Sequence, residues 1–137
     1  MYELFDHTAD LGLRVTASDF EGLLAEAARG LFSIIMENPD EIRSQQQVRL
    51  EIAGEDPPFL LFDWLNELLY TFDSRHLVLH DFDVEAIPGR GVRGGAWGEP
   101  LDRARHKLDH EVKAITYHGL RAEQTALGWE AEVIVDI

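Results

Sequence analysis

The sequence predicts a single α+β domain over residues 1–137, with two helices packed on a largely antiparallel β-sheet. Three observations lead to this prediction. The length is that of about one domain. Two long segments carry apolar residues at helical spacing, whereas most other segments alternate apolar and polar residues as strands do. The strands are grouped apart from the helices, which favours an α+β arrangement over alternating β and α units.

The first third of the chain predicts two strands and a helix. Residues 1–18 form two short strands around a turn, and a helix with one apolar face follows. The segment SDFE that begins this helix predicts a capping box, in which Ser18 caps the helix and Glu21 reaches back to the free amide. Asn38-Pro39 ends the helix.

A second helix begins at Asp56-Pro57, because a cap residue there precedes a proline that needs no amide partner. Apolar residues cover more than half of its circumference, so we expect it to be sandwiched between a sheet and another element. Residues 48–52 alternate as a strand before it, and the chain from Leu77 onward reads as strands alone, of which residues 112–118 are one. A change of phase near Asp81 predicts a β-bulge, and the glycines that follow mark a hairpin turn.

The chain is strongly acidic. Twelve Lys+Arg and 26 Asp+Glu residues give a formal net charge of −14. This field repels phosphate backbones, so we expect no direct high-affinity binding of nucleic acid. The same surface suits cations or a basic protein partner. The polar stretch Gly98–Glu111 is rich in basic residues, and it is either a plain surface loop or a contact edge beside the acidic body.

Several classes of protein are excluded or disfavoured. The chain has no cysteine, which excludes disulfides, thiolate zinc sites and cysteine nucleophiles. No apolar run approaches the roughly 20 residues that cross a bilayer, and no basic-then-apolar leader begins the chain. We therefore expect no membrane association and a cytoplasmic location. The motifs of P-loop, α/β-hydrolase, zinc-protease and dinucleotide sites are also missing, so we expect no enzymatic activity of its own.

Three polar clusters are candidates for cation binding or catalysis. The segment DHTAD at residues 6–10 supplies two carboxylates and an imidazole, although a plain turn would use the same residues. Near the end of the chain, Asp136 lies on the strand face opposite the core, where the α-carboxylate of Ile137 would be fixed beside it. Carboxylate oxygens favour Ca²⁺, Mg²⁺ or Mn²⁺. In the third cluster, KAITYH, Lys113 and His118 have the chemistry for acid–base work or phosphate binding.

Taken together, three segments resemble the archease family. They are residues 2–13 (YELFDHTADLGL), residues 113–118 (KAITYH) and residues 133–137 (VIVDI), in that family's order. Pro57-Pro58 before an apolar helix also fits. The resemblance covers essentially the whole chain, and the departure is residues 89–110, where the glycine and arginine content is unlike the rest.

This resemblance implies a protein that activates an RtcB-type tRNA-splicing RNA ligase without being a ligase itself. It implies that the protein promotes guanylylation of the ligase's active-site histidine, restores turnover and can broaden nucleotide use. It also implies a divalent-cation site, usually holding calcium, at Asp10, Asp136 and Ile137, with His7 close by. An acidic activator could dock on the basic face that the ligase must offer to RNA.

Two other classes stay open from the residues alone. A metal-dependent hydrolase or phosphotransferase would use Asp10 and Asp136, and it would need an open metal position beside a substrate pocket. A general chaperone would need an exposed apolar patch, whereas the sequence assigns its apolar residues to helix stripes and strand faces.

Overall fold

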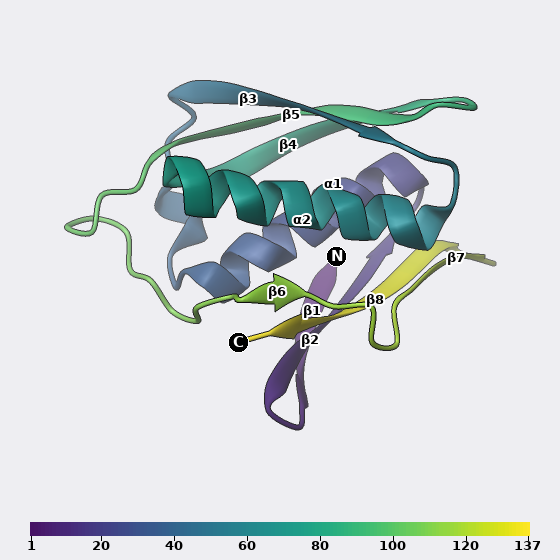
Figure 1. Ribbon diagram of the computed structural model, residues 1–137, viewed down its shortest axis with the longest axis horizontal. Helices are drawn as coiled ribbons and strands as arrows, with labels where there is room; N and C mark the ends of the chain where they lie inside the picture. The colour runs from purple at the N-terminus through teal and green to yellow at the C-terminus, as the bar shows by residue number, and fades with distance from the viewer.

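The computed structural model describes residues 1–137 and places two helices between two antiparallel sheets (Figure 1). The predicted α+β class is confirmed, and its strands form two sheets rather than one. One sheet has the order β1-β2-β8-β6, with β7 also pairing with β8, and the other has the order β3-β5-β4. The elements are β1 (Tyr2–His7), β2 (Asp10–Ala17), α1 (Phe20–Ile35), the 3-10 turn η1 (Pro39–Glu41), β3 (Gln46–Ala53), α2 (Pro57–Arg75), β4 (Leu77–Ile87), β5 (Gly91–Pro100), β6 (Ala114–Ile115), β7 (Arg121–Thr125) and β8 (Gly128–Asp136).

The first helix, α1, packs against β4 of one sheet and β2 of the other. The predicted cap is wrong by one residue: the side chain of Asp19, not Ser18, accepts the N–H of Gly22 at 2.7 Å. A capping box needs its acid three residues after the cap, and that position is a glycine here. Glu21 instead accepts the N–H of Ala86 at 3.0 Å and so ties the helix to β4.

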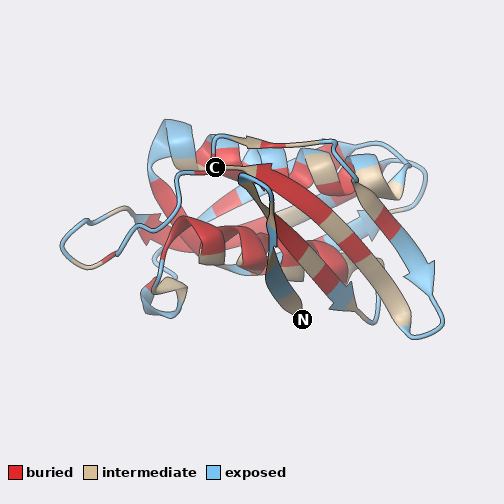
Figure 2. Ribbon diagram, turned by 90° about the horizontal axis from the view of Figure 1, so that it is seen from below, coloured by how far each residue is buried: buried red, intermediate tan, exposed pale blue.

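The second helix begins where predicted and joins the first through one buried tryptophan. Trp64 is fully buried, and its indole N–H donates to the carbonyl of Leu24 on α1 at 2.9 Å. The buried residues of both helices and both sheets form one core of 32 residues, whereas exposed residues lie in the loops and on the outward sides of helices and strands (Figure 2). Neither helix is long and apolar enough to cross a membrane.

The three-stranded sheet confirms two local predictions. A register shift between Leu79 and Asp81 is the expected bulge in β4, and the glycine-containing turn joins β4 to β5 as a hairpin. Gly98 lets β5 lie close to β4, because a Cβ atom there would overlap the carbonyl oxygen of Val78.

A buried charged cluster fixes the loop that follows β5. Glu99 accepts hydrogen bonds from the guanidinium of Arg105 at 2.9 and 3.2 Å, from Nε2 of His106 at 3.0 Å and from the N–H of Arg43 at 2.7 Å. The N–H of Asp102 donates to Nδ1 of His106 at 2.9 Å, so Nε2 is the ring nitrogen that donates to Glu99. The bonds from Arg105 lower the pKa of Glu99 to about 2, against the effect of burial. The basic stretch is therefore an anchored loop rather than a free one.

This cluster predicts a stability that depends on pH. Because the pKa of Glu99 falls from 4.5 to about 2 on folding, its contribution is complete above about pH 4.5 and disappears as the pH falls toward 2. We expect Glu99→Gln to lower the free energy of unfolding near neutral pH by about 3 kcal/mol, since Arg105 loses a charged partner. Denaturant titrations followed by circular dichroism at several pH values measure this difference.

The matched control is Glu51→Gln, because Glu51 is exposed and has no bonded partner in the fold. Its effect on the unfolding free energy should stay within about 0.5 kcal/mol. A deficit for Glu99→Gln that stays constant between neutral pH and pH 2.5 would contradict the assignment.

Candidate functional site

The ladder between β2 and β8 brings the two ends of the chain to one place. These strands are antiparallel, with Leu11 opposite Val135. Continuing the same register by one residue aligns Asp10 with Asp136, and paired Cα atoms in antiparallel strands lie about 4.5–5.5 Å apart. On the other edge of β8, Ala114 of β6 pairs with Asp136. The three segments singled out in the sequence therefore meet at one end of the five-stranded sheet (Figure 1).

The turn that carries Asp10 is short and strained. His7 pairs with Asp10, so only Thr8 and Ala9 join β1 to β2. Thr8 has φ of 49°, in the left-handed region that β-branched residues avoid. Two-residue hairpin turns require such a backbone, and glycine or asparagine is the usual choice there.

An imidazole lies beside the first aspartate. Nδ1 of His7 is buried, has no hydrogen-bond partner and lies 4.0 Å from Oδ2 of Asp10. The rings of His7 and His118 are neighbours, with centroids 5.1 Å apart. Both histidines stand out in the sequence, but their contact depends on the pairing of β1, β2, β8 and β6, which the sequence does not show.

Charge is compensated along β8 but not at its end. Glu130 and Glu132 accept hydrogen bonds from Arg121 at 2.7 and 3.1 Å, and Arg14 donates to Glu132 at 3.4 Å. The bond from Arg121 lowers the pKa of Glu130. Asp136 belongs to no ion pair. The imidazole of His7 is the one basic group within 4.0 Å of the Asp10 carboxylate.

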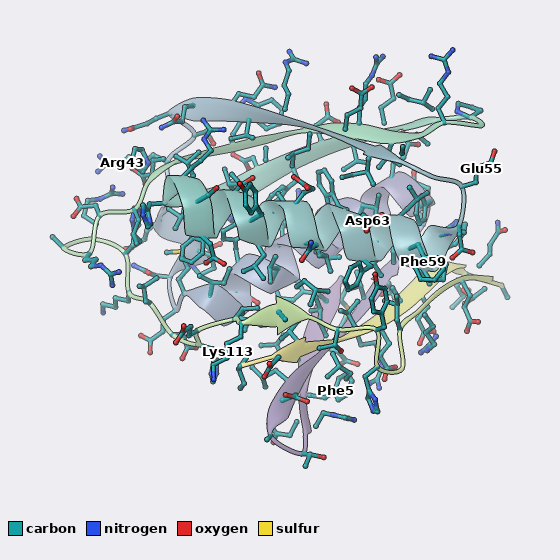
Figure 3. All side chains as sticks on the ribbon, viewed as in Figure 1. Phe5, Arg43, Glu55, Phe59, Asp63 and Lys113 are labelled. Atoms are coloured by element: carbon teal, nitrogen blue, oxygen red, sulfur yellow. The ribbon has the colours of Figure 1, made fainter.

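The third segment is less regular than predicted. The strand expected over residues 112–118 is wrong in length, since β6 covers only Ala114–Ile115. Thr116 ends it, because its hydroxyl donates to the carbonyl of Ile134 at 2.8 Å, the same oxygen that its N–H reaches at 3.1 Å. The backbone N–H of Lys113 donates to the carbonyl of Asp136 at 2.8 Å, so Lys113 lies beside the end of β8 (Figure 3).

The groups that meet at this end of the sheet offer few ligands for a metal ion, and those ligands are oxygen atoms. Ile137 is half-buried and follows the last residue of β8. The predicted set contains two carboxylate side chains, those of Asp10 and Asp136, and the α-carboxylate of Ile137. The chain contains no group of three or more His, Cys, Asp or Glu side chains placed to hold a metal ion. A cation at this site would therefore depend on the α-carboxylate of Ile137 as well as on the two side chains.

Comparison with known proteins identifies the class. Residues 2–137 match the model of the Archease protein family, so the chain belongs to that family, as the sequence resemblance predicts. A protein archease from Methanopyrus kandleri is 40% identical over 139 residues, which cover 99% of each chain. Another, from Pyrococcus furiosus, is 38% identical over 140 residues, which cover 99% of this chain and 98% of the other.

Two solved structures share the fold. The solution structure of Methanobacterium thermoautotrophicum protein 1598 superposes with a TM-score of 0.88 at 31% identity and covers 99% of this chain and 98% of that one. The crystal structure of an archease from Thermotoga maritima, described as a possible chaperone, has a TM-score of 0.63 at 20% identity, with 100% of this chain and 98% of that one covered. The second likeness shows the fold alone.

The strained turn yields a prediction. Thr8→Gly should raise the free energy of unfolding by about 0.5–1 kcal/mol, because glycine adopts the left-handed backbone without the penalty that a Cβ atom brings. Thr16→Gly is the matched control, since Thr16 lies in extended β2 and should lose a similar amount of stability. Thermal and denaturant unfolding measure both. A loss of stability in Thr8→Gly would mean that the threonine side chain itself supports the turn.

Proposed function

We propose that the chain is a non-catalytic, cation-binding protein cofactor that activates an RtcB-type RNA ligase in tRNA splicing or RNA repair. It promotes guanylylation of the ligase and its turnover, and it acts in the cytoplasm. The observation that carries the proposal is the meeting of the three archease-like segments at one end of the sheet, on a chain that belongs to the archease family.

The oxygen ligands at this end of the five-stranded sheet suit a hard divalent cation. Asp10, Asp136 and the α-carboxylate of Ile137 would hold it, and oxygen ligands of this kind suit Ca²⁺ first, with Mg²⁺ or Mn²⁺ as alternatives. Neither aspartate has a Lys or Arg partner, so two negative charges on facing strands are left without compensation. A bound ion supplies the missing positive charge. Continuing the β2–β8 register aligns Asp10 with Asp136, and on the other edge of β8 the N–H of Lys113 donates to the carbonyl of Asp136.

The overall charge supports a protein partner rather than RNA. A formal charge of −14 repels a phosphate backbone, whereas an RNA ligase must carry a basic surface to hold its substrate. Complementary charge steers two such proteins together and makes their association weaken as salt rises. The chain can therefore engage the ligase without binding RNA itself.

A general chaperone is the second candidate function. Contrary to the expectation from the sequence, the structure leaves aromatic side chains exposed together, among them Phe59 and Tyr117. Exposed apolar surface of this kind binds other proteins. A general chaperone would protect many unfolded proteins, whereas a ligase activator needs one folded partner.

The proposal predicts activation without independent turnover. Incubated alone with GTP, ATP or RNA ends, the protein should form no product. Added in substoichiometric amounts to an RtcB-type ligase, it should speed formation of the guanylylated ligase and give repeated ligation per ligase molecule. Gel assays of guanylylation and of joined RNA measure both effects.

Two outcomes would overturn this proposal. Hydrolysis by the isolated protein that Asp10→Asn abolishes would indicate a metal-dependent hydrolase. Suppression of the aggregation of unrelated proteins, without any effect on the ligase, would favour the general chaperone.

The cation site predicts the behaviour of one charge-neutral variant. Asp136→Asn should weaken Ca²⁺ binding by about tenfold or more, because it removes one charged ligand, and it should reduce ligase activation. Its fold should persist, because Asp136 lies on the face away from the core. Isothermal titration calorimetry with Ca²⁺, Mg²⁺ and Mn²⁺ measures the affinity.

Asp83→Asn is the control, because it removes the same charge from an exposed position on the other sheet. If Asp136→Asn binds the ion and activates the ligase as the parent does, the site lies elsewhere.

A further inference from the structure

Acidic side chains and two aromatic ones are interspersed along the solvent face of α2 and at its N-cap. Its residues follow one another at spacings of three or four, so each is the neighbour of the next on one side of the helix. All of them are exposed, and Figure 3 shows Phe59 and Asp63 on this side. We call this the acidic-aromatic face; its residues are Asp56, Phe59, Asp63, Glu67, Tyr70 and Asp73.

The aromatic side chains are exposed and partly preassembled. Phe59, Tyr70 and Tyr117 expose 54%, 65% and 60% of their surface. The ring of Tyr117 stacks on Phe62 with centroids 4.0 Å apart and meets the edge of Phe59 at 6.0 Å. Phe59 and Tyr117 also line a shallow hollow of about 490 Å³ with Asp56, Pro58 and Leu120. Clustered exposed rings on a small protein are typical of an interaction surface.

The carboxylates of this face have no partners within the chain. Some acids elsewhere are compensated, as Glu99 is by Arg105 and Glu85 is by Arg93. None of the four acids on the acidic-aromatic face takes part in an ion pair. None of their carboxylates accepts a hydrogen bond from another residue of the chain. The face therefore presents uncompensated negative charge directly between exposed rings.

This face is continuous with the candidate cation site. Tyr117 is followed by His118, whose ring lies 5.1 Å from that of His7, and His7 adjoins Asp10. A partner that covers the hollow beside Tyr117 would therefore also reach the end of the five-stranded sheet.

We infer that the acidic-aromatic face, with Tyr117, is the surface that docks onto an arginine-bearing basic face of the RNA ligase. The inference rests on the proposed function. A guanidinium group satisfies both features of the face, because it stacks on an aromatic ring and also forms paired hydrogen bonds with a carboxylate. A protein that holds RNA carries such groups on its surface. A second copy of this chain is a poor occupant, because two equally acidic faces would repel each other.

The test compares variants of this face with matched controls elsewhere. Phe59→Ala, Tyr117→Ala and Asp63→Lys should each weaken binding to the ligase by about tenfold or more, since exposed rings and paired charges are typical hot spots. Asp63→Lys should also flatten the salt dependence of binding. Calorimetric titration of the ligase gives the affinities, and melting temperatures show whether each variant is folded.

The controls are Leu127→Ala, at a turn residue with 95% exposure, and Asp83→Lys on the outer sheet. Both should bind within about twofold of the parent. At saturating concentration the face variants should restore the full guanylylation rate, which separates lost docking from a lost cation site. Asp63 is exposed and takes part in no hydrogen bond or ion pair, so Asp63→Lys should stay folded even if Tyr117→Ala does not.

The outcomes distinguish this inference from the proposed function. If the parent activates the ligase and the face variants bind it equally well, the docking surface is overturned while the function stands. If the parent neither binds nor activates the ligase, the proposed function fails, and the docking surface fails with it. Variants that change only self-association, or only binding to free RNA, would likewise overturn the ligase as occupant.

Discussion

The pairing of β8 with β2 is the constraint on which the functional end of the molecule depends. Leu13 and Val133 are fully buried opposite each other, which fixes the register of the two strands. Because side chains alternate across a strand, a slip by one residue would turn every core residue outward. The same alternation puts Asp10 and Asp136 together on the outer face. The hydrophobic core thus decides where the two carboxylates meet, with no need of an attraction between them.

The helices and local irregularities could be predicted from the sequence because they depend on neighbours within a few residues. The apolar spacing of α1 and α2, the start of α2 after Asp56 and the bulge near Asp81 are all local patterns. The capping residue was missed by one position, since both Ser18 and Asp19 are good caps and only the backbone distinguishes them. The alternation that marks a strand says nothing about its partner. For this reason the division into two sheets could not be predicted.

Parts of the candidate site escaped prediction for the same reason. The segments that hold His7 and His118 were recognised, but their rings come together only through three strand pairings. The contact between Glu99 and His106, outside the candidate site, could not be predicted either, because the polar stretch that contains them is typical of a surface loop. Both side chains are buried, and the sequence of a short polar segment does not indicate burial. For Phe59 the sequence predicts burial, because the residue lies in an apolar helix, but the structure exposes it. The helix is apolar around more of its circumference than the core covers.

The candidate cation site and the acidic-aromatic face both hold acids without a Lys or Arg partner, and the two call for different partners. Asp10 and Asp136 end adjacent strands, so a compact charge at one point can neutralise both. The acids of the acidic-aromatic face are spread from Asp56 to Asp73, a span of about 25 Å along the helix axis. No single ion bridges that distance, since ligands lie within about 2.6 Å of a bound calcium. Only an extended basic surface matches it. The compact site and the extended face meet at Tyr117 and His118, so one partner surface can cover both.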